Sequence, residues 1–110
     1  MYLRQSIQTV LGLVFLVTSS FALSNTEFTY NIIDGGIEVT GCVDGCPSDL
    51  VIPEEINGYI VTVIGEGAFP GKGLTSIVLP DTLERINEYA FAYNKLTSIV
   101  IPNAVNYIGQ

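Results

Sequence analysis

The sequence predicts a β-rich solenoid, in which short repeats stack on one another and share a continuous core. The first indication is a repeat: the segment LTSIVLP at residues 74–80 returns 22 residues later as LTSIVIP at residues 96–102. A unit of this length cannot bury its own apolar face and must stack on copies of itself. The second indication is that apolar residues recur at the same position of successive copies. These columns are Val61, Leu83 and Val105; Ile64, Ile86 and Ile108; and Phe69 and Phe91.

Residues 1–22 are expected to form a secretory signal peptide. Arg4 is the only charge before an apolar run at residues 10–17, and Ser20 and Ala22 then supply small residues for a signal peptidase. The run is shorter than the roughly 20 residues that span a bilayer, which disfavours a membrane anchor. We expect cleavage after Ala22, with Ser24 as the second choice. The remaining chain is then exported to the extracellular space, the cell surface or the periplasm.

The exported part is strongly acidic. All 11 carboxylates lie beyond Ala22, while only Lys72, Arg85 and Lys95 remain as cations, so its net charge is 3 − 11 = −8. This charge argues against nucleic acid or an anionic membrane surface as a partner.

Residues 23–46 are expected to form an N-terminal cap. Residues 28–33 and 36–41 have the composition of two strands, and Asp34-Gly35 between them is a hairpin turn signal. A solenoid exposes the apolar end of its first repeat, so a terminal element of different sequence is expected to cover it.

The two cysteines, Cys42 and Cys46, are expected to form an intramolecular disulfide, the default in an exported chain. Closing so short a loop is worth about 2 kcal/mol on the chain-entropy model. Zinc is disfavoured because the chain has no histidine and the remaining ligands would be carboxylates. A redox role is weaker still, since the spacing is not C-x-x-C. No metal or cofactor is expected.

Residues 47–110 contain about two and a half repeats. Each copy begins with a segment of alternating pattern. In the complete copy, Ile77 and Leu79 alternate with Ser76 and Val78, which predicts a short strand with one apolar face. The proline that follows is expected to end the strand.

The second half of each repeat follows a different pattern. The spacing of Leu83, Ile86 and Ala90 favours a loose turn followed by a short helical turn on the outer side. The first copy has five extra residues, 56–60, whose Asn57-Gly58 pair predicts a looped-out turn.

With the repeat aligned, the pattern L-T-S-I-x-[IL]-P-x-x-[LV]-x-x-I-x-x-x-A-F resembles the BspA-type leucine-rich repeats. It is seen in LTSIVLPDTLERINEYAF and again in LVIPEEINGYIVTVIGEGAF, and the resemblance covers residues 42–110. It implies a right-handed leucine-rich-repeat solenoid with short parallel strands on a concave face and loops on the convex side. It also implies a secreted or surface-attached protein, since several members are adhesins that bind host or neighbouring-cell proteins.

The sequence stops at residue 110, before the Ala-Phe pair of its third copy, whereas such proteins usually carry many repeats. We therefore expect truncation at the C-terminus. The alternative is that the open apolar end around Ile99, Ile101, Val105 and Ile108 pairs with another chain, such as a second copy.

The predicted strands leave one strip of side chains free to bind a partner. Alternation points two columns outward: Asp49, Ser76 and Ser98, and Val51, Val78 and Val100. Such a flat, mildly apolar strip suits an extended peptide or a protein surface. The competing interpretation is that valine is present only as a strand former. Further candidates, for protein or carbohydrate contact, are Tyr59, Tyr89, Tyr93 and Tyr107.

No catalytic residue is expected. Without histidine, no Ser-His or Cys-His pair can form, and the pairs Glu54–Glu55 and Glu84–Glu88 are expected to be solvated carboxylates. The sequence thus predicts a secreted or cell-surface, non-catalytic module for protein binding or adhesion, with a protein or a surface polysaccharide as partner. The alternative is a purely structural N-terminal capping segment of a larger repeat-containing surface protein.

Overall fold

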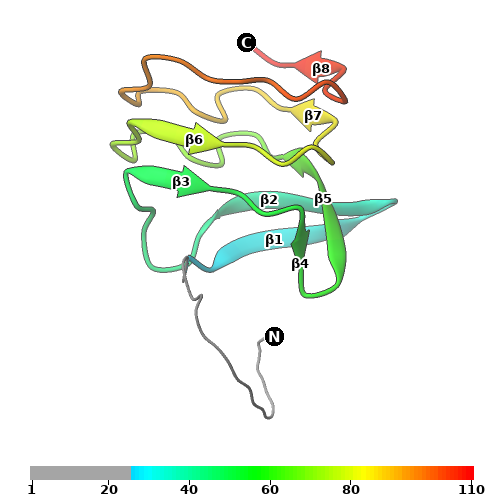
Figure 1. The fold of residues 1–110 in the computed structure, drawn as a ribbon. Helices are drawn as coiled ribbons and strands as arrows, with labels where there is room; N and C mark the ends of the chain where they lie inside the picture. Colours follow the sequence, from blue (N-terminus) through cyan, green and yellow to red (C-terminus); the bar gives the residue numbers. More distant parts are fainter. Residues whose placement is uncertain (1–25) are drawn as a thin grey trace.

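The computed structural model describes residues 26–110, so the expected signal peptide lies outside the described residues. Figure 1 shows this part of the chain winding into stacked coils above an N-terminal hairpin. It contains eight strands and no helix. The strands are β1 (Phe28–Ile33), β2 (Gly36–Cys42), β3 (Asp49–Val51), β4 (Glu55–Ile56), β5 (Tyr59–Ile64), β6 (Ser76–Val78), β7 (Arg85–Ile86) and β8 (Tyr107–Ile108).

The strands form two sheets on different sides of the coils. The larger sheet has the order β1-β2-β5-β7-β8, with β4 paired to β5, and the smaller sheet is β3-β6. Apart from the antiparallel pairs β1-β2 and β4-β5, all pairs are parallel. Arg85 in β7 lies opposite Tyr107 in β8, and the two residues are one repeat apart in the sequence. Residues separated by one repeat are therefore neighbours in the parallel ladder. The predicted solenoid of short parallel strands is confirmed.

Backbone hydrogen bonds continue from coil to coil outside the strands. The amide of Asn87 donates to the carbonyl of Ile64 at 3.0 Å, and the amide of Phe69 donates to the carbonyl of Ala90 at 2.8 Å. This ladder supplies partners for backbone groups in the turns, which would otherwise be costly to bury. It also holds the coils in register.

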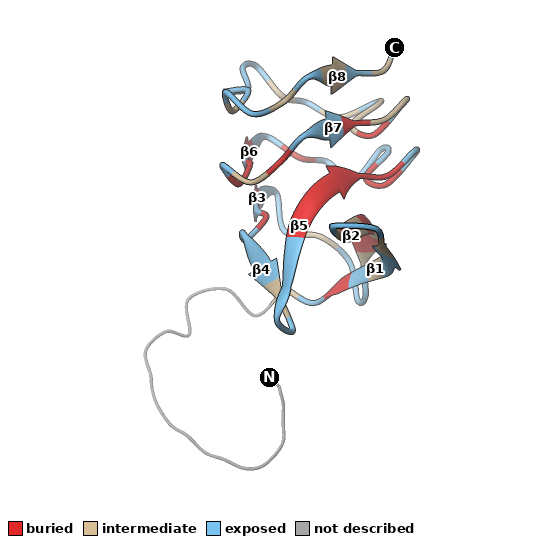
Figure 2. Cartoon of the chain, turned by 90° about the vertical axis from the view of Figure 1, so that its right-hand side faces the viewer, coloured by how far each residue is buried: buried red, intermediate tan, exposed pale blue. Residues whose placement is uncertain are grey.

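The core is built from the predicted columns in the first two coils. Phe69 and Leu83 are fully buried, and the second half of β5, residues 61–64, is buried while its first two residues are exposed (Figure 2). In the last coil the prediction fails for Ile108, which is 53% exposed, and Val105 is only partly buried.

The Phe69 and Phe91 rings stack at a centroid distance of 5.8 Å with an interplanar angle of 6°. Phe28 of β1 makes a T-shaped contact with Phe69, with a centroid distance of 6.3 Å and an interplanar angle of 87°. The N-terminal hairpin therefore continues the aromatic column of the repeats.

Both predicted hairpin turns are present. Asp34-Gly35 joins β1 to β2, and Asn57-Gly58 joins β4 to β5 with φ angles of 53° and 86°. Two residues with positive φ define the type I′ turn that suits a two-residue hairpin. Asn57 Nδ2 also donates a hydrogen bond of 2.8 Å to the Tyr30 hydroxyl, which ties the inserted hairpin to β1.

The short helical turns expected on the convex side are absent. After β7 the chain makes successive turns, in which the amide of Ala90 donates to the carbonyl of Asn87 and the amide of Ala92 to that of Tyr89, both at 3.3 Å. Tyr89 has a φ of 58°. A left-handed residue cannot continue a right-handed helix, so the prediction of a helical turn is wrong.

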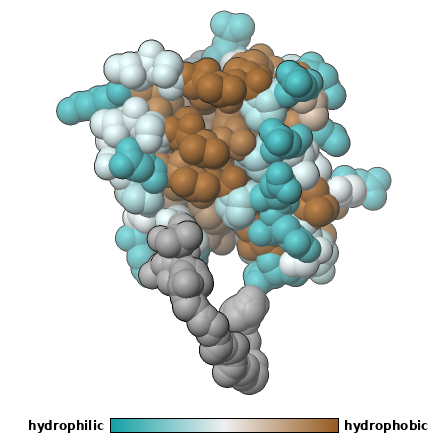
Figure 3. All heavy atoms as spheres, viewed as in Figure 1, coloured by the Kyte–Doolittle hydropathy of each residue, from teal (hydrophilic) through white to brown (hydrophobic). Residues whose placement is uncertain are grey.

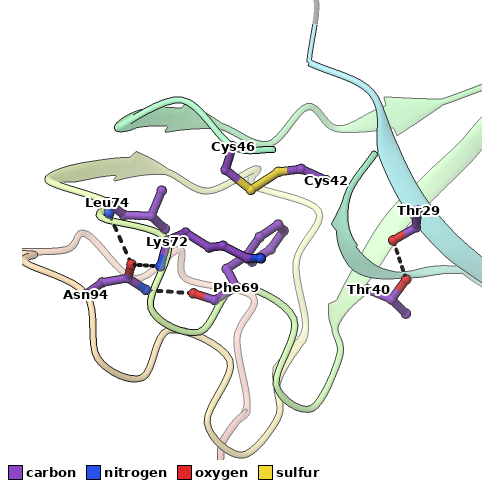
Figure 4. Close-up of a disulfide and its surroundings, with 8 residues drawn as sticks. All are labelled: Thr29, Thr40, Cys42, Cys46, Phe69, Lys72, Leu74 and Asn94. Carbon is purple, nitrogen blue, oxygen red and sulfur yellow. Dashed lines mark hydrogen bonds between the residues drawn. A yellow bond between two sulfur atoms is a disulfide. The ribbon is translucent and has the colours of Figure 1, made fainter. Parts of the chain in front are cut away.

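The expected disulfide is confirmed: Cys42 and Cys46 are bonded, with their Cα atoms 5.5 Å apart. Both half-cystines are half-buried and pack against the core. Figure 4 shows the bond close to the Phe69 ring. The crosslink therefore joins the end of the hairpin to the start of the first coil.

The side chain of Asn94 bonds the backbone of two coils (Figure 4). Its Oδ1 accepts hydrogen bonds from the amides of Lys72 (2.8 Å) and Leu74 (3.0 Å). Its Nδ2 donates to the carbonyls of Phe69 (2.7 Å) and Phe91 (3.1 Å). One amide side chain thus supplies partners to four backbone groups where the chain turns toward the next strand.

Replacing Asn94 by alanine should lower the free energy of unfolding by about 2–3 kcal/mol, because it leaves partly buried backbone groups without partners. Urea denaturation measures this. Asn103→Ala is the matched control, since Asn103 is exposed and its side chain makes no hydrogen bond within residues 26–110; it should change the value by less than about 0.5 kcal/mol. Equal effects of the two substitutions would contradict the role of Asn94.

Intact-mass analysis of the exported protein should show a mass lower than that of the reduced chain by the two thiol hydrogens. Cys42→Ser together with Cys46→Ser should lower stability by about 2 kcal/mol, because the unfolded chain regains loop entropy. Two free thiols in the exported protein would contradict the assignment.

Candidate functional site

The candidate binding strip lies on the sheet formed by β3 and β6. Asp49 is paired with Ser76 and Val51 with Val78, while Leu50 and Ile77 between them are buried. Successive side chains of a strand point to opposite faces, so burial of the middle residue directs its two neighbours to solvent. We refer to Asp49, Val51, Ser76, Val78, Ser98 and Val100 as the valine strip.

The structure exposes all six residues of the valine strip. The exposed fraction rises along the column from 46% for Val51 to 57% for Val78 and 82% for Val100. Figure 3 shows apolar residues in a vertical column on this face, with hydrophilic residues on both sides.

The third row of the valine strip is less regular than the first two. Ser98 and Val100 lie in a segment that is not part of a strand, so the β3-β6 ladder brings together only the first two rows. The coil that contains them is tied to the preceding one by a hydrogen bond of 2.9 Å from the amide of Lys95 to the carbonyl of Leu74.

A carboxylate is fixed at one side of the valines. Ser76 Oγ donates a hydrogen bond of 2.7 Å to Asp49 Oδ1, and Thr75 Oγ1 approaches the same oxygen at 3.4 Å. Both donors come from the neighbouring coil. Because Asp49 is held in this way, it presents an acceptor in a defined position beside the apolar column.

The opposite sheet carries a second polar cluster. The Arg85 guanidinium lies 4.2 Å from the centroid of the Tyr107 ring, and the Tyr107 hydroxyl donates a hydrogen bond of 2.9 Å to Glu88 Oε2. The pKa of Glu88 is lowered, first by a hydrogen bond from its own backbone amide and then by the Tyr107 hydroxyl. The same hydroxyl–carboxylate bond is the largest cause of the raised pKa of Tyr107.

Reasoning from sequence missed this cluster. It grouped Glu88 with Glu84 and treated both as solvated. The available signal was the repeat period, because Arg85 and Tyr107 occupy the same position of neighbouring coils and must therefore lie side by side.

The four tyrosines singled out in the sequence do not form one site. Tyr107 is held within the polar cluster, and Tyr59 lies in the inserted hairpin, 42% exposed. Tyr89 and Tyr93 lie in the turns after β7, where they are 62% and 90% exposed.

Within residues 26–110, no group of three or more His, Cys, Asp or Glu is placed to hold a metal ion. The same range contains no helix that is long and apolar enough to cross a membrane.

Coils of short parallel strands, joined by a backbone ladder at the repeat period, define a solenoid of the leucine-rich-repeat class. Residues 48–110 match the family model described as BspA type Leucine rich repeat region (6 copies), and the chain belongs to this family. No curated protein matches the sequence.

Two bacterial leucine-rich repeat proteins of known structure are similar to this chain. The T. pallidum protein TpLRR is 24% identical with a TM-score of 0.53, over 76% of this chain and 51% of that protein. A protein from Bacteroides ovatus is 23% identical with a TM-score of 0.49, over 86% of this chain and 31% of that protein. The first likeness supports the shared fold, and the chain spans only about half of TpLRR.

The family as a whole has the following general properties. Leucine-rich repeats generally mediate protein binding and are typically non-catalytic, and BspA-type members are typically secreted or at the cell surface. The Cys42–Cys46 disulfide is consistent with export.

The pKa of Tyr107 should fall toward 10.0 in Glu88→Gln, because the amide accepts a hydrogen bond without the negative charge that favours the protonated phenol. NMR detection of the tyrosine ring carbons during a pH titration measures it. Glu84→Gln is the control, since Glu84 lies in the same coil but makes no bond to Tyr107.

The sign for stability follows from these shifts. Because the pKa of Tyr107 is raised in the folded state, its contribution is present below pH 10.0 and is lost as pH rises through the folded pKa. Because the pKa of Glu88 is lowered, its contribution is present above pH 4.5 and is lost as pH falls through the folded pKa. An unchanged Tyr107 pKa in Glu88→Gln would contradict the statement about Tyr107.

Proposed function

We propose that this chain is an exported, non-catalytic module for protein binding or adhesion, and that the valine strip is its contact surface. The observation that carries the proposal is the register of the β3-β6 ladder. It places two outward columns, one polar and one of exposed valine, over a fully or nearly buried apolar row.

The chemistry of the valine strip favours a protein over a polysaccharide. Burying an exposed valine fully contributes about 1.5–3 kcal/mol, which aliphatic side chains of a protein can provide. The serine hydroxyls and the oriented Asp49 carboxylate add polar contacts beside this apolar centre. The small size of all these residues allows the backbone of an extended segment to approach closely.

A non-catalytic role agrees with the side chains that the chain offers. The sequence has no histidine, so nucleophile activation by imidazole is not available. Glu88, whose pKa is lowered, is already engaged by the Tyr107 hydroxyl, and a lowered pKa is the wrong direction for a general acid near neutral pH.

A purely structural capping role is the second candidate, and one observation favours it. Strand β2 runs parallel to β5 and occupies the place of a preceding coil, while Phe28 closes the phenylalanine column. On this reading, the hairpin and first coils begin a longer solenoid and do not contact a partner.

Val78→Glu combined with Val100→Glu should weaken retention on immobilised partner protein at least about tenfold, because two charges would be placed at the apolar centre of the contact. Retention is measured with the secreted chain on a panel of purified extracellular proteins. Both positions point to solvent, so the variant should keep its thermal midpoint.

Val43→Glu is the control, since Val43 is also an exposed valine, at 49%, but lies in the loop closed by the disulfide and is not part of the valine strip. Retention that is unchanged in the double variant would exclude the valine strip as the contact surface and would favour the capping role.

A further inference from the structure

The turns that follow β7 present two tyrosines on another side of the solenoid. They leave the strand on the side of the coil away from β3 and β6 (Figure 2). Tyr89 is 62% exposed and Tyr93 is 90% exposed. Neither hydroxyl has a hydrogen-bond partner within the described part of the chain. The two side chains therefore contribute little to the stability of the folded coil.

Both tyrosines have an unfavourable backbone conformation. Their φ angles are 58° and 61°, in the left-handed region that disfavours bulky residues. In the preceding coil the same positions are Gly67 and Gly71, each with a φ of 59°. The coil geometry thus calls for glycine at both places, and the second coil has tyrosine instead. Strained positions of this kind are a reason to look for function.

The backbone that holds the two rings is fixed. The amide of Tyr89 donates to the carbonyl of Gln110 at 3.1 Å, and the amide of Gly71 donates to the carbonyl of Ala92 at 2.7 Å. Asn94 bonds the carbonyl of Phe91 within the same segment. Rigid aromatic side chains lose little freedom on binding, which is why tyrosine is favoured in contact surfaces.

We infer that Tyr89 and Tyr93 form a second contact surface, which binds an arginine-bearing segment of a partner protein. A tyrosine ring face attracts a cation, and guanidinium stacks on it better than ammonium does. Beyond residue 22 the chain has 11 carboxylates and three cations, so its field attracts a basic segment. Within the molecule, Arg85 already stacks on Tyr107 with Glu88 beside it, and Glu88 directly precedes Tyr89.

This surface is separate from the valine strip. The two surfaces lie on different sides of the coil, so either proposal can be wrong while the other is right. Val78→Glu with Val100→Glu should not weaken arginine binding, since it removes neither tyrosine and adds negative charge. The tyrosine variants should leave retention through the valine strip unchanged.

The test uses labelled nona-arginine and nona-lysine peptides, which carry equal charge, in binding assays at about 0.15 M salt. The wild-type chain should bind nona-arginine more tightly than nona-lysine. Tyr89→Gly with Tyr93→Gly should remove this preference and weaken nona-arginine binding about tenfold. The same double variant should raise the thermal midpoint by about 4–8 °C, because it relieves strain at both positions.

Two controls separate the ring from the backbone. Tyr93→Ala removes the ring but keeps a side chain in the left-handed region, so it should weaken binding without the rise in thermal midpoint. Tyr59→Ala removes an exposed tyrosine elsewhere and should change neither. The inference is overturned if the wild-type chain binds the two peptides equally or not at all, or if the double glycine variant loses stability. It is also overturned if the double variant loses binding to a soluble neutral glucan while keeping nona-arginine binding.

Discussion

The parallel backbone ladder between neighbouring coils is the constraint on which the rest of this structure depends. It joins residues one repeat apart, in the strands as well as in the turns. Each inward position therefore lies against a like residue, as in the near-parallel stack of Phe69 and Phe91. A domain of this size buries only about 60–65% of its unfolded surface, so a core built from a few repeated columns is its main source of stability.

The same ladder decides which outward side chains can act together. It brings Ser76 to Asp49 and Tyr107 to Arg85, pairs that are far apart in sequence. It also fixes the turns, because Asn94 satisfies backbone groups of two successive coils. The valine strip and the turns that carry Tyr89 and Tyr93, the two contact surfaces proposed above, would therefore be presented by one backbone scaffold. A preformed scaffold of this kind lowers the cost of binding.

The N-terminal hairpin begins the stack with a different sequence. Strand β2 gives β5 a hydrogen-bonded neighbour, and Phe28 gives Phe69 an aromatic one. The Cys42–Cys46 disulfide lies where the hairpin passes into the first coil and packs against the core. Covalent and packing interactions thus meet at the junction between the hairpin and the repeats.

The sequence by itself determined the repeat, the buried columns of the first two coils, both hairpin turns and the disulfide. These features follow from periodicity or from a few adjacent residues, such as Asn57-Gly58, whose conformational preference is local. The tertiary structure alone decided the turn conformation after β7, because the ladder imposes a left-handed backbone on Tyr89 against the preference of that residue. The one indication of this conformation in the sequence is Gly67, which occupies the same position one coil earlier.

The bonds of Asn94 and the cluster of Arg85, Tyr107 and Glu88 likewise depend on side-chain directions across coils. Sequence spacing gives the register of such neighbours, and folding decides which of their atoms meet.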